Sequence, residues 1–201
     1  MSLKVKKNIK KLKTKVLFLG YNSSETKIIN HLISNNCTVD HDNEKLNNFN
    51  INYDIVICFG YRHILKKEFI NKCDCPIINL HISYLPYNRG AHPNFWSFYD
   101  NTICGVTIHL VDEGIDTGPI LFQKKVIFKN EVTFYETYKR LFNEIENLFI
   151  LNIKKILIQN WHEKLQKNEG SFHLASDLPK DFRGWDSNIK LEIKRLKKNN
   201  K

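Results

Sequence analysis

Three polar residues near the middle of the chain carry side chains that can act together on one carbonyl group: Asn79, His81 and Asp116. Asn79 and His81 end an apolar run. Alternate side chains of a strand share a face, so both can project into one pocket, roughly 7 Å apart at about 3.3 Å per residue. Asp116 lies in the turn-rich stretch 112–119. An amide donor, an imidazole and a carboxylate that orients it are the groups needed to pass an acyl group to an amine.

The order of the motifs around these residues points to one protein family more specifically than any single motif does. Asn-Leu-His-Ile-Ser at 79–83 is followed by Leu-Pro at 85–86, Arg-Gly at 89–90, Gly-Val-Thr-Ile-His at 105–109 and Gly-Ile-Asp-Thr-Gly at 114–118. Over roughly residues 50 to 128, this series resembles the signature of the formyltransferases that use 10-formyltetrahydrofolate. The loop Tyr-Asn-Arg-Gly-Ala-His-Pro-Asn-Phe-Trp at 87–96 is most similar to the branch that formylates amino sugars carried on nucleotides.

The resemblance implies an α/β fold and a role for each polar residue. The fold is Rossmann-like, with a mostly parallel central sheet, helices on both faces and a short C-terminal extension. Asn79 would donate to the charged oxygen of a tetrahedral intermediate, and His81 would donate a second hydrogen bond or move the proton of the attacking amine. Asp116 would stabilise the imidazolium. Singly, Asn79 is better explained as a strand cap and Asp116 as a turn former. As an ordered set they favour catalysis.

The resemblance also implies which residues bind the two substrates. Those expected to line the folate pocket, largely through main-chain atoms, are Arg62, His63, Ile64, Leu65, Asp112, Glu113, Gly114 and Ile115. Those expected to contact the acceptor are Gly20, Tyr21, Asn22, Arg89, His92 and His109. Alternatives stay open for three of them: Arg89 and His92 as solvated loop residues, and His109 as a buried, internally satisfied histidine.

The predicted reaction moves a formyl group from 10-formyltetrahydrofolate to the primary amine of a nucleotide-linked amino sugar, such as a dTDP-4-amino-4,6-dideoxyhexose, in surface-polysaccharide or O-antigen synthesis. The length of the chain also fits a phosphoribosylglycinamide formyltransferase. A methionyl-tRNA formyltransferase is less favoured, because that family adds a sizeable C-terminal domain. A non-catalytic folate-binding module is disfavoured because all three polar residues are present. The sugar, the position of its amine and the nucleotide are not fixed by these residues, and a homodimer is left open.

The composition is that of a folded chain with a strong positive charge. A length of 201 residues suits one sizeable core, and 42% hydrophobic with 12% aromatic residues excludes a disordered chain. Much of the net charge of +10 lies in Lys4–Lys15, with seven lysines, and Lys190–Lys201, with six basic residues. Neither run interleaves aromatics for base stacking, so solvated ends are favoured and no nucleic-acid partner is expected. We expect a basic segment at 1–14, a catalytic domain at 15–160 and an extension at 161–201.

Other features indicate a cytoplasmic protein without a metal. The apolar run 16–19 is too short for a secretion signal. No apolar run approaches the ~18 residues of a membrane span. Five cysteines without framework spacing suit reduced thiols. Cys-Asp-Cys at 73–75 is spaced too tightly for a usual zinc pair, and the histidines of the motifs lack metal-ligand spacing.

Hydrophobic patterns predict the elements that hold these residues. Strands are expected at 15–19, 55–59, 76–81, 105–111 and 121–128, with a loop or weak strand around 38–41. Helices are expected at 66–72, around 96–98, and from the 20–24 turn to about residue 33, where Asn22 or Ser23 would provide the cap. The turn lacks the full Gly-x-Gly-x-x-Gly fingerprint, so no dinucleotide cofactor is expected, although its amides could hold a substrate phosphate.

The sequence pattern of the last third of the chain predicts one long helix followed by an extension. Thr133 and Glu136 have the spacing of a capping box, and apolar residues then recur at helical spacing to Leu157. Core packing explains this face, with a dimer seam as the minority alternative. The extension, which contains Phe172, His173, Trp185 and Asp186, is expected to wrap the domain or partly enclose the substrate.

Overall fold

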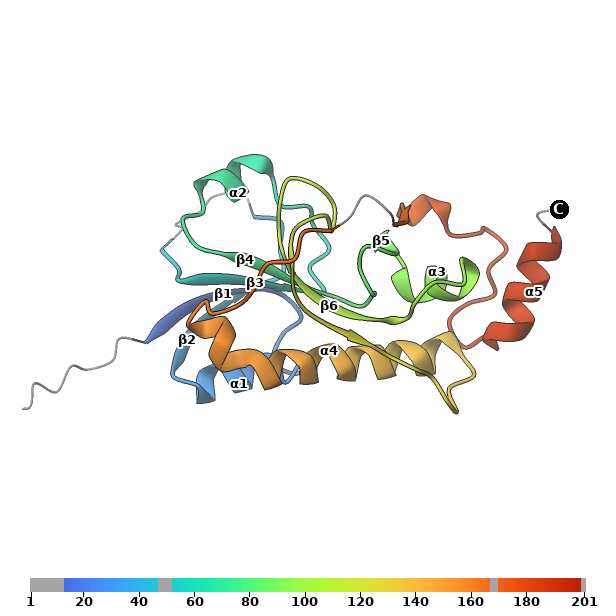
Figure 1. Cartoon of the computed structure of the whole chain (residues 1–201), viewed down its shortest axis with the longest axis horizontal. Coiled ribbons are helices and arrows are strands. Elements are labelled where there is room, and N and C mark those ends of the chain that lie inside the picture. Colours follow the sequence, from blue (N-terminus) through green and yellow to red (C-terminus); the bar gives the residue numbers. More distant parts are fainter. Residues whose placement is uncertain (1–12, 47–51, 167–169, 200–201) are drawn as a thin grey trace, which may run out of the picture.

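The computed structural model describes residues 13–46, 52–166 and 170–199, so most of the basic segment predicted at 1–14 lies outside the described residues. Its centre is a six-stranded sheet in the order β2-β1-β3-β4-β6-β7 (Figure 1). The strands are β1 Thr14–Gly20, β2 Cys37–Asp42, β3 Ile55–Phe59, β4 Ile77–His81, β6 Gly105–Leu110 and β7 Ile120–Lys125. The first four run parallel, whereas β6 pairs antiparallel with both β4 and β7. The predicted mostly parallel sheet is confirmed.

The strand β3 lies inside the sheet, and all five of its side chains are buried. A strand covered on both faces needs apolar residues at every position, which is why its sequence shows no alternation. Its neighbours β1 and β4 run in the same direction, so the carboxyl ends of all three meet at one edge. The loops that leave these strands are therefore brought together there, where open α/β sheets bind ligands. The weak strand expected around 38–41 is β2, beside β1.

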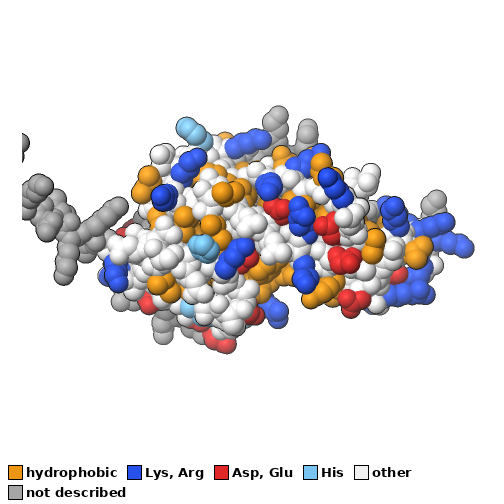
Figure 2. All heavy atoms as spheres, turned by 90° about the horizontal axis from the view of Figure 1, so that it is seen from below, with side chains coloured by type: hydrophobic (Ala, Val, Ile, Leu, Met, Phe, Trp, Pro, Cys, Tyr) orange, Lys and Arg blue, Asp and Glu red, His pale blue; other side chains and the backbone are white. Residues whose placement is uncertain are grey.

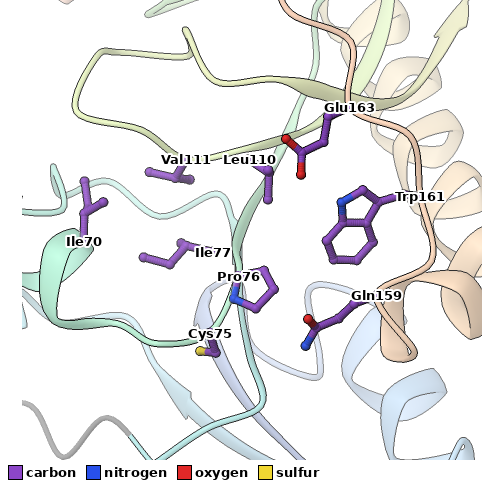
Figure 3. Close-up of a pocket in the computed structure, with 9 residues that line it drawn as sticks. All are labelled: Ile70, Cys75, Pro76, Ile77, Leu110, Val111, Gln159, Trp161 and Glu163. Carbon is purple, nitrogen blue, oxygen red and sulfur yellow. The ribbon is translucent and has the colours of Figure 1, made fainter.

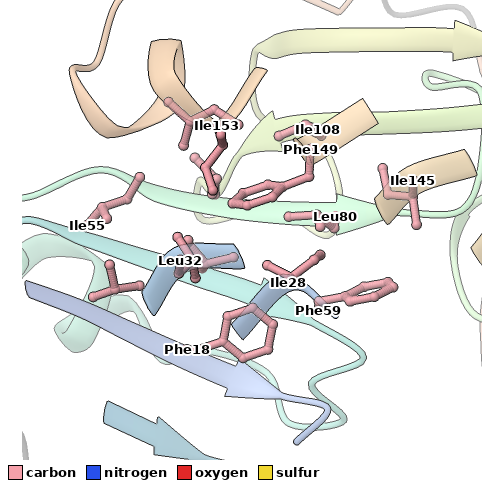
Figure 4. Close-up of a cluster of buried hydrophobic side chains, with 14 of the residues drawn as sticks. Phe18, Ile28, Leu32, Ile55, Phe59, Leu80, Ile108, Ile145, Phe149 and Ile153 are labelled. Atoms are coloured by element: carbon pink, nitrogen blue, oxygen red, sulfur yellow. The ribbon is translucent and has the colours of Figure 1, made fainter. Parts of the chain in front are cut away.

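Helices cover both faces of the sheet. One face carries Phe18, Ile57 and Leu80, which pack with α1 Ile28–Ser34 and α4 Phe134–Leu157 (Figure 4). The other face carries Leu19, Val56 and Ile77, which pack near Phe69 of α2 Lys67–Lys72. Because side chains alternate along β4, Leu80 enters the α4 core while Asn79 and His81 share the face of Ile77.

The predicted capping box at the start of α4 is present. Thr133 Oγ1 accepts a hydrogen bond from Glu136 N at 3.2 Å, and Glu136 Oε2 accepts one from Thr133 N at 3.0 Å. The buried side chains that follow form a stripe against the sheet: Leu141, Ile145, Phe149, Ile153 and Ile156. The helix is therefore a core element, as its periodicity predicted.

The predicted cap of the first helix is wrong. This helix begins at Ile28, and neither Asn22 nor Ser23 caps it. Asn22 Oδ1 instead accepts hydrogen bonds from the amide and hydroxyl of Ser24, within the preceding turn. Glu146 Oε1, from α4, accepts from Lys27 N at 2.9 Å and from Thr26 Oγ1 at 2.7 Å. A carboxylate 119 positions away thus satisfies an amide at the helix start, a partner that no local pattern reveals.

The C-terminal extension packs against the loop that follows β4. In this loop β5 Arg89–Gly90 pairs parallel with β8 Phe172–His173, and α3 Pro93–Tyr99 follows. The short helix η1 Ala175–Asp177 and the helix α5 Ile189–Asn199 complete the extension. A third apolar cluster joins these parts and includes Phe95, Trp96, Phe134, Ile189 and Leu196. The indole of Trp96 stacks on the ring of His173 at 3.8 Å and is buried, as expected for a core residue.

The helix α5 was not among the predicted elements, and basic side chains gather around it. Figure 2 shows Lys and Arg side chains clustered at the end of the molecule formed by α5. None of the helices in the described part of the chain has the length and apolar character needed to cross a bilayer.

Candidate active site

Two neighbouring strands bring four polar side chains onto one face of the sheet. Asn79 of β4 is paired in register with His109 of β6, and His81 with Thr107. Residues directly opposite in an antiparallel pair have adjacent side chains on the same face. His81 and His109 are both buried, and their ring centres lie 6.3 Å apart. The predicted alternation along β4 therefore holds, and it places Asn79 beside the two imidazoles.

The turn after β6 carries Asp116 back over these residues. Asp112 Oδ1 accepts from Gly114 N at 3.1 Å and from Thr117 Oγ1 at 2.6 Å, which tightens the turn. Asp116 has a left-handed backbone with φ of 53°, a conformation that aspartate tolerates better than most residues. Gly118 lies so close to the carbonyl of Leu110 that a Cβ would collide with it. The Gly-Ile-Asp-Thr-Gly sequence thus allows the chain to fold back sharply.

The carboxylate of Asp116 is the centre of the cluster. Its Oδ1 accepts from Asn79 Nδ2 at 3.1 Å and lies 3.4 Å from His109 Nε2. Its Oδ2 accepts from Gly90 N at 2.9 Å and lies 3.6 Å from His81 Nδ1. Burial acts to raise the pKa of Asp116, but the electrostatic interaction with His81, the contact with His109 and the hydrogen bond from the Gly90 amide together hold it well below its ordinary value. The group is therefore a carboxylate at neutral pH.

The amide of Asn79 is fully engaged as a donor. Its Nδ2 contacts Asp116 Oδ1 at 3.1 Å and His109 Nε2 at 3.2 Å. The other ring nitrogen of His109, Nδ1, lies 2.8 Å from the carbonyl oxygen of Leu110. A carbonyl only accepts, so Nδ1 carries the proton, and in the neutral ring Nε2 is an acceptor for Asn79. A substrate oxygen that binds to Asn79 must therefore displace one of these two contacts.

The imidazole of His81 is held between a carbonyl and the carboxylate. Its Nε2 lies 3.2 Å from the carbonyl oxygen of Asn88 and donates to it, so the nitrogen that gains or loses a proton is Nδ1. That nitrogen faces Asp116 Oδ2 at 3.6 Å. This distance is longer than a hydrogen bond, as is common in catalytic groups before substrate binds. The arrangement can hold a positive imidazolium next to a carboxylate.

The two loops expected to bind folate lie next to each other. Lys67 Nζ and Glu113 Oε2 form an ion pair at 2.8 Å, which joins the start of α2 to the 112–116 turn. The loop that precedes α2 contains Ile64, which is 77% exposed, and the turn contains Ile115, which is 41% exposed. Each of the two loops therefore leaves apolar surface uncovered. Such surface fits a flat heteroaromatic ring, but the individual folate contacts predicted from the sequence remain predictions.

The residues expected to contact the acceptor fall into separate groups. Gly20 and Tyr21 lie at the carboxyl end of β1, where the phenol of Tyr21 contacts that of Tyr138 at 2.9 Å. Asn22 lies in the exposed turn that follows. His109 is inside the cluster described above and is buried, with both ring nitrogens engaged, as the interpretation of an internally satisfied histidine expects. Its contact with the acceptor stays a prediction.

Arg89 and His92 lie in the loop after β4 and are held by the extension. Arg89 donates through Nε and Nη2 to Gln166 Oε1 at 3.1 and 3.0 Å. The ring of His92 lies 5.5 Å from that of Trp185, and burial lowers the pKa of this histidine. Arg89 is thus a bound structural contact in this state rather than a freely solvated side chain.

Two further residues take part in the cluster without having been assigned a role. Gly90, whose φ is 84°, donates its amide to Asp116, and Gln166 contacts both Arg89 and the Asp116 turn. Gly90 was visible in the Arg-Gly motif. The role of Gln166 could not be predicted from the sequence, because this residue lies 50 positions from Asp116 in a segment with no recognisable motif.

A cavity of about 470 Å³ lies elsewhere, at the amino end of β4 (Figure 3). It is lined by Ile70, Cys75, Pro76, Ile77, Leu110, Val111, Gln159, Trp161 and Glu163. None of Asn79, His81 and Asp116 contributes to it. In the described ranges, no group of three or more His, Cys, Asp or Glu residues is arranged to hold a metal ion.

Comparison with known proteins gives a consistent match. The model of a family described as formyl transferase matches residues 14–153. The structure of the formyltransferase PseJ from Anoxybacillus kamchatkensis, in complex with UDP-4,6-dideoxy-4-formamido-L-AltNAc and tetrahydrofolate, superposes with a TM-score of 0.79 at 36% identity. That similarity covers 88% of this chain and 96% of PseJ.

Curated relatives match over shorter regions. A methionyl-tRNA formyltransferase of Thermodesulfovibrio yellowstonii is 43% identical over 89 residues, which cover 44% of this chain and 28% of that protein. A dTDP-4-amino-4,6-dideoxyglucose formyltransferase of Mycobacterium bovis is 30% identical over 125 residues, which cover 62% of this chain and 53% of that protein. The chain thus spans about half the length, or less, of these two relatives.

Proposed function

The chain belongs to the formyl transferase family, and we propose that it transfers a formyl group from 10-formyltetrahydrofolate to the primary amine of a nucleotide-linked amino sugar. One observation carries the proposal: Asn79, His81 and Asp116 form a single cluster in a chain similar to PseJ over almost the whole length of that enzyme. The PseJ structure holds a UDP-linked formamido sugar and tetrahydrofolate. The mycobacterial relative supports a dTDP-linked 4-amino-4,6-dideoxyhexose as an acceptor of the same class.

The proposed reaction exchanges one carbon–nitrogen bond for another. The acceptor nitrogen attacks the formyl carbon, a bond forms between them, and the bond from that carbon to N10 of the folate breaks. The proton lost by the amine ends on the leaving nitrogen. Negative charge develops on the formyl oxygen in between, so a donor aimed at that oxygen lowers the barrier.

Each residue of the cluster has a separate role in this reaction. Asn79 donates to the formyl oxygen when its contact with His109 is exchanged for the substrate. Asp116 stays ionised because its pKa is depressed, and its Oδ2 faces Nδ1 of His81. His81 holds or releases a proton at Nδ1, 3.6 Å from Asp116 Oδ2, and so serves the transfer from amine to leaving nitrogen. The exposed Ile64 and Ile115 offer apolar contact to the pterin ring.

The alternative with independent support is formylation of methionyl-tRNA. It is motivated by the 43% identity to the Thermodesulfovibrio enzyme, although that match covers only 28% of the relative. Binding of tRNA through phosphates weakens steeply as salt rises. A salt series with initiator tRNA therefore tests this alternative, and binding that is weak at low salt excludes it.

The experiment for the main proposal is a direct assay of both products. The protein is incubated with 10-formyltetrahydrofolate and, in parallel, with UDP- and dTDP-linked 4-amino sugars, glycinamide ribonucleotide and methionyl-tRNA. Release of tetrahydrofolate is followed together with the mass of the acceptor. We expect turnover with at least one nucleotide sugar. Turnover only with glycinamide ribonucleotide or methionyl-tRNA would refute the assignment of the acceptor.

The cellular setting belongs to the same proposal. A role in surface-polysaccharide synthesis, such as O-antigen assembly, is supported by the kind of sugar bound in the PseJ complex and named in the mycobacterial relative. A cytoplasmic location is supported by the five free cysteines.

A further inference from the structure

Gln166, in the C-terminal extension, connects the two loops that hold the carboxylate of Asp116. Its Nε2 donates to the carbonyl oxygens of Asp116 at 2.8 Å and of Gly118 at 2.7 Å. Its Oε1 accepts from Nε and Nη2 of Arg89 at 3.1 and 3.0 Å. A glutamine amide offers two N–H donors and one oxygen with two lone pairs, so this side chain uses its full hydrogen-bonding capacity here.

These bonds close a ring around the carboxylate. Gly90, next to Arg89 in the chain, donates its amide to Asp116 Oδ2 at 2.9 Å. From Arg89 the path continues through Gln166 and returns to the main chain of Asp116. Because Asp116 has a left-handed backbone, its orientation depends on contacts that hold the turn in place. Gln166 holds the carbonyl oxygens of Asp116 and Gly118, which lie on either side of Thr117. It also holds Arg89, the residue before Gly90, whose amide binds the Asp116 carboxylate.

The main chain around Gln166 also ties this ring to β7 and to the loop after β4. Lys164 N donates to Ile120 O at 2.9 Å, and Arg89 N donates to Ser171 O at 2.9 Å. Ser171 Oγ accepts a hydrogen bond from Asn88 N and donates one to Asn88 Oδ1. The carbonyl oxygen of Asn88 in turn accepts from His81 Nε2. The extension is therefore in contact with the supports of both His81 and Asp116.

We propose that Gln166 is a positioning residue for formyl transfer: by clamping Arg89 to the 116–118 turn, it sets the distance of the Asp116 carboxylate from His81 and Asn79. This inference rests on the function proposed above. Displacement of a reacting group by about 1 Å can lower turnover about 100-fold. The clamp therefore acts mainly on kcat rather than on the binding of either substrate.

Two variants separate the two halves of the clamp. Gln166→Met keeps the length of the side chain and removes all four hydrogen bonds. Gln166→Glu keeps an acceptor for Arg89 but places an oxygen against the carbonyls of Asp116 and Gly118. Asn152→Leu is the matched control, because it likewise removes a side-chain amide that donates to a main-chain carbonyl, Leu148 O at 2.9 Å within α4, away from the cluster. For each protein, kcat, KM, the melting temperature and amide hydrogen exchange of the 112–118 peptide are measured.

We expect kcat to fall about 10- to 100-fold in both Gln166 variants, with KM for the folate changed less than about threefold. Exchange in 112–118 should become faster while α4 keeps its protection, and the control should match the wild type. A Gln166→Met enzyme with wild-type kcat, whether or not exchange changes, would overturn the positioning role. If the wild type turns over no acceptor, the proposed function fails. Faster exchange in Gln166→Met then still establishes the clamp, and unchanged exchange refutes it.

Discussion

Asn79 and Asp116 lie 37 positions apart in the chain, yet Asn79 Nδ2 is hydrogen bonded to Asp116 Oδ1 at 3.1 Å. The bond joins a strand of the sheet to a turn that folds back over it. The remaining N–H of Asn79 faces His109, so two partners fix the direction of the amide. The bond to Asp116 holds the amide in place before substrate binds, so that only the contact with His109 has to be exchanged for the substrate oxygen. The carboxylate thus orients the amide as well as the imidazole of His81.

Asp116 makes the stability of the protein depend on acidic pH. Its pKa in the folded state is lowered, mainly by His81 and His109 acting against burial, from an ordinary value of about 3.9. A depressed pKa means that the unfolded chain takes up this proton first, so the stabilisation is complete above about pH 4 and is lost as the pH falls below it. We expect the free energy of unfolding of the wild type to exceed that of Asp116→Asn at pH 6, with the difference shrinking toward pH 3.

Urea unfolding at several pH values measures this difference, and Asp186→Asn, at an exposed position, is the control. A difference between wild type and Asp116→Asn that stays constant from pH 6 to pH 3 would mean that the carboxylate is not stabilised by its neighbours.

The exposed isoleucines of the two loops expected to bind folate provide a test of that site. We expect Ile64→Ser to weaken the binding of folinic acid about tenfold, equivalent to about 1.4 kcal/mol of lost apolar contact. Calorimetric titration gives the affinity. Ile127→Ser is the control, because Ile127 is 70% exposed and lies beyond β7. Equal affinities for the two variants would place the pterin elsewhere, with the cavity of Figure 3 as the next candidate.

The core between α4 and the sheet should be sensitive to loss of volume. Phe149 is fully buried, so Phe149→Ala is expected to lower the free energy of unfolding by about 3–5 kcal/mol. Leu151 lies on the same helix but is 81% exposed, and Leu151→Ala should change it by less than about 0.5 kcal/mol. Denaturant titration of both variants checks the pair. Similar losses would show that the solvent-facing side of α4 is covered in solution.

The capping box at the start of α4 makes a smaller, local contribution. Thr133→Ala removes the oxygen that accepts from Glu136 N and should cost about 1 kcal/mol. Thr133→Ser retains this oxygen and serves as the control. If both variants unfold at the same denaturant concentration, the cap does not contribute to stability.

Local patterns were sufficient for the main elements of the central sheet and its helices and for part of the site, but not for α5 or the short strands β5 and β8. The unbroken apolar run of β3, the helical repeat of α4 and its Thr133–Glu136 box each correspond to what the structure contains. The period of two along β4 correctly placed Asn79 and His81 on one face. These features depend on neighbours in sequence, which is why they could be predicted.

Contacts between distant segments could not be predicted in this way. Glu146 satisfies the start of α1 from another helix, and Gln166 reaches the Asp116 turn from the extension. The engagement of Asn79 by His109 depends on the register between β4 and β6, which the sequence did not specify. Each of these partners is a common polar residue, and only the folded chain distinguishes it from others of its type.

The rate of formyl transfer in Asn79→Ala tests the central claim most directly. Loss of one donor to a developing oxyanion typically lowers turnover about 100- to 1000-fold. Tetrahydrofolate release is measured with the best nucleotide-sugar acceptor, with Asn160→Ala, at an exposed position, as the control. We expect a fall in kcat of that size for Asn79→Ala, with an unchanged melting temperature for both variants. A folded Asn79→Ala enzyme that retains more than about a tenth of wild-type kcat would contradict the assignment of this cluster as the site of acyl transfer.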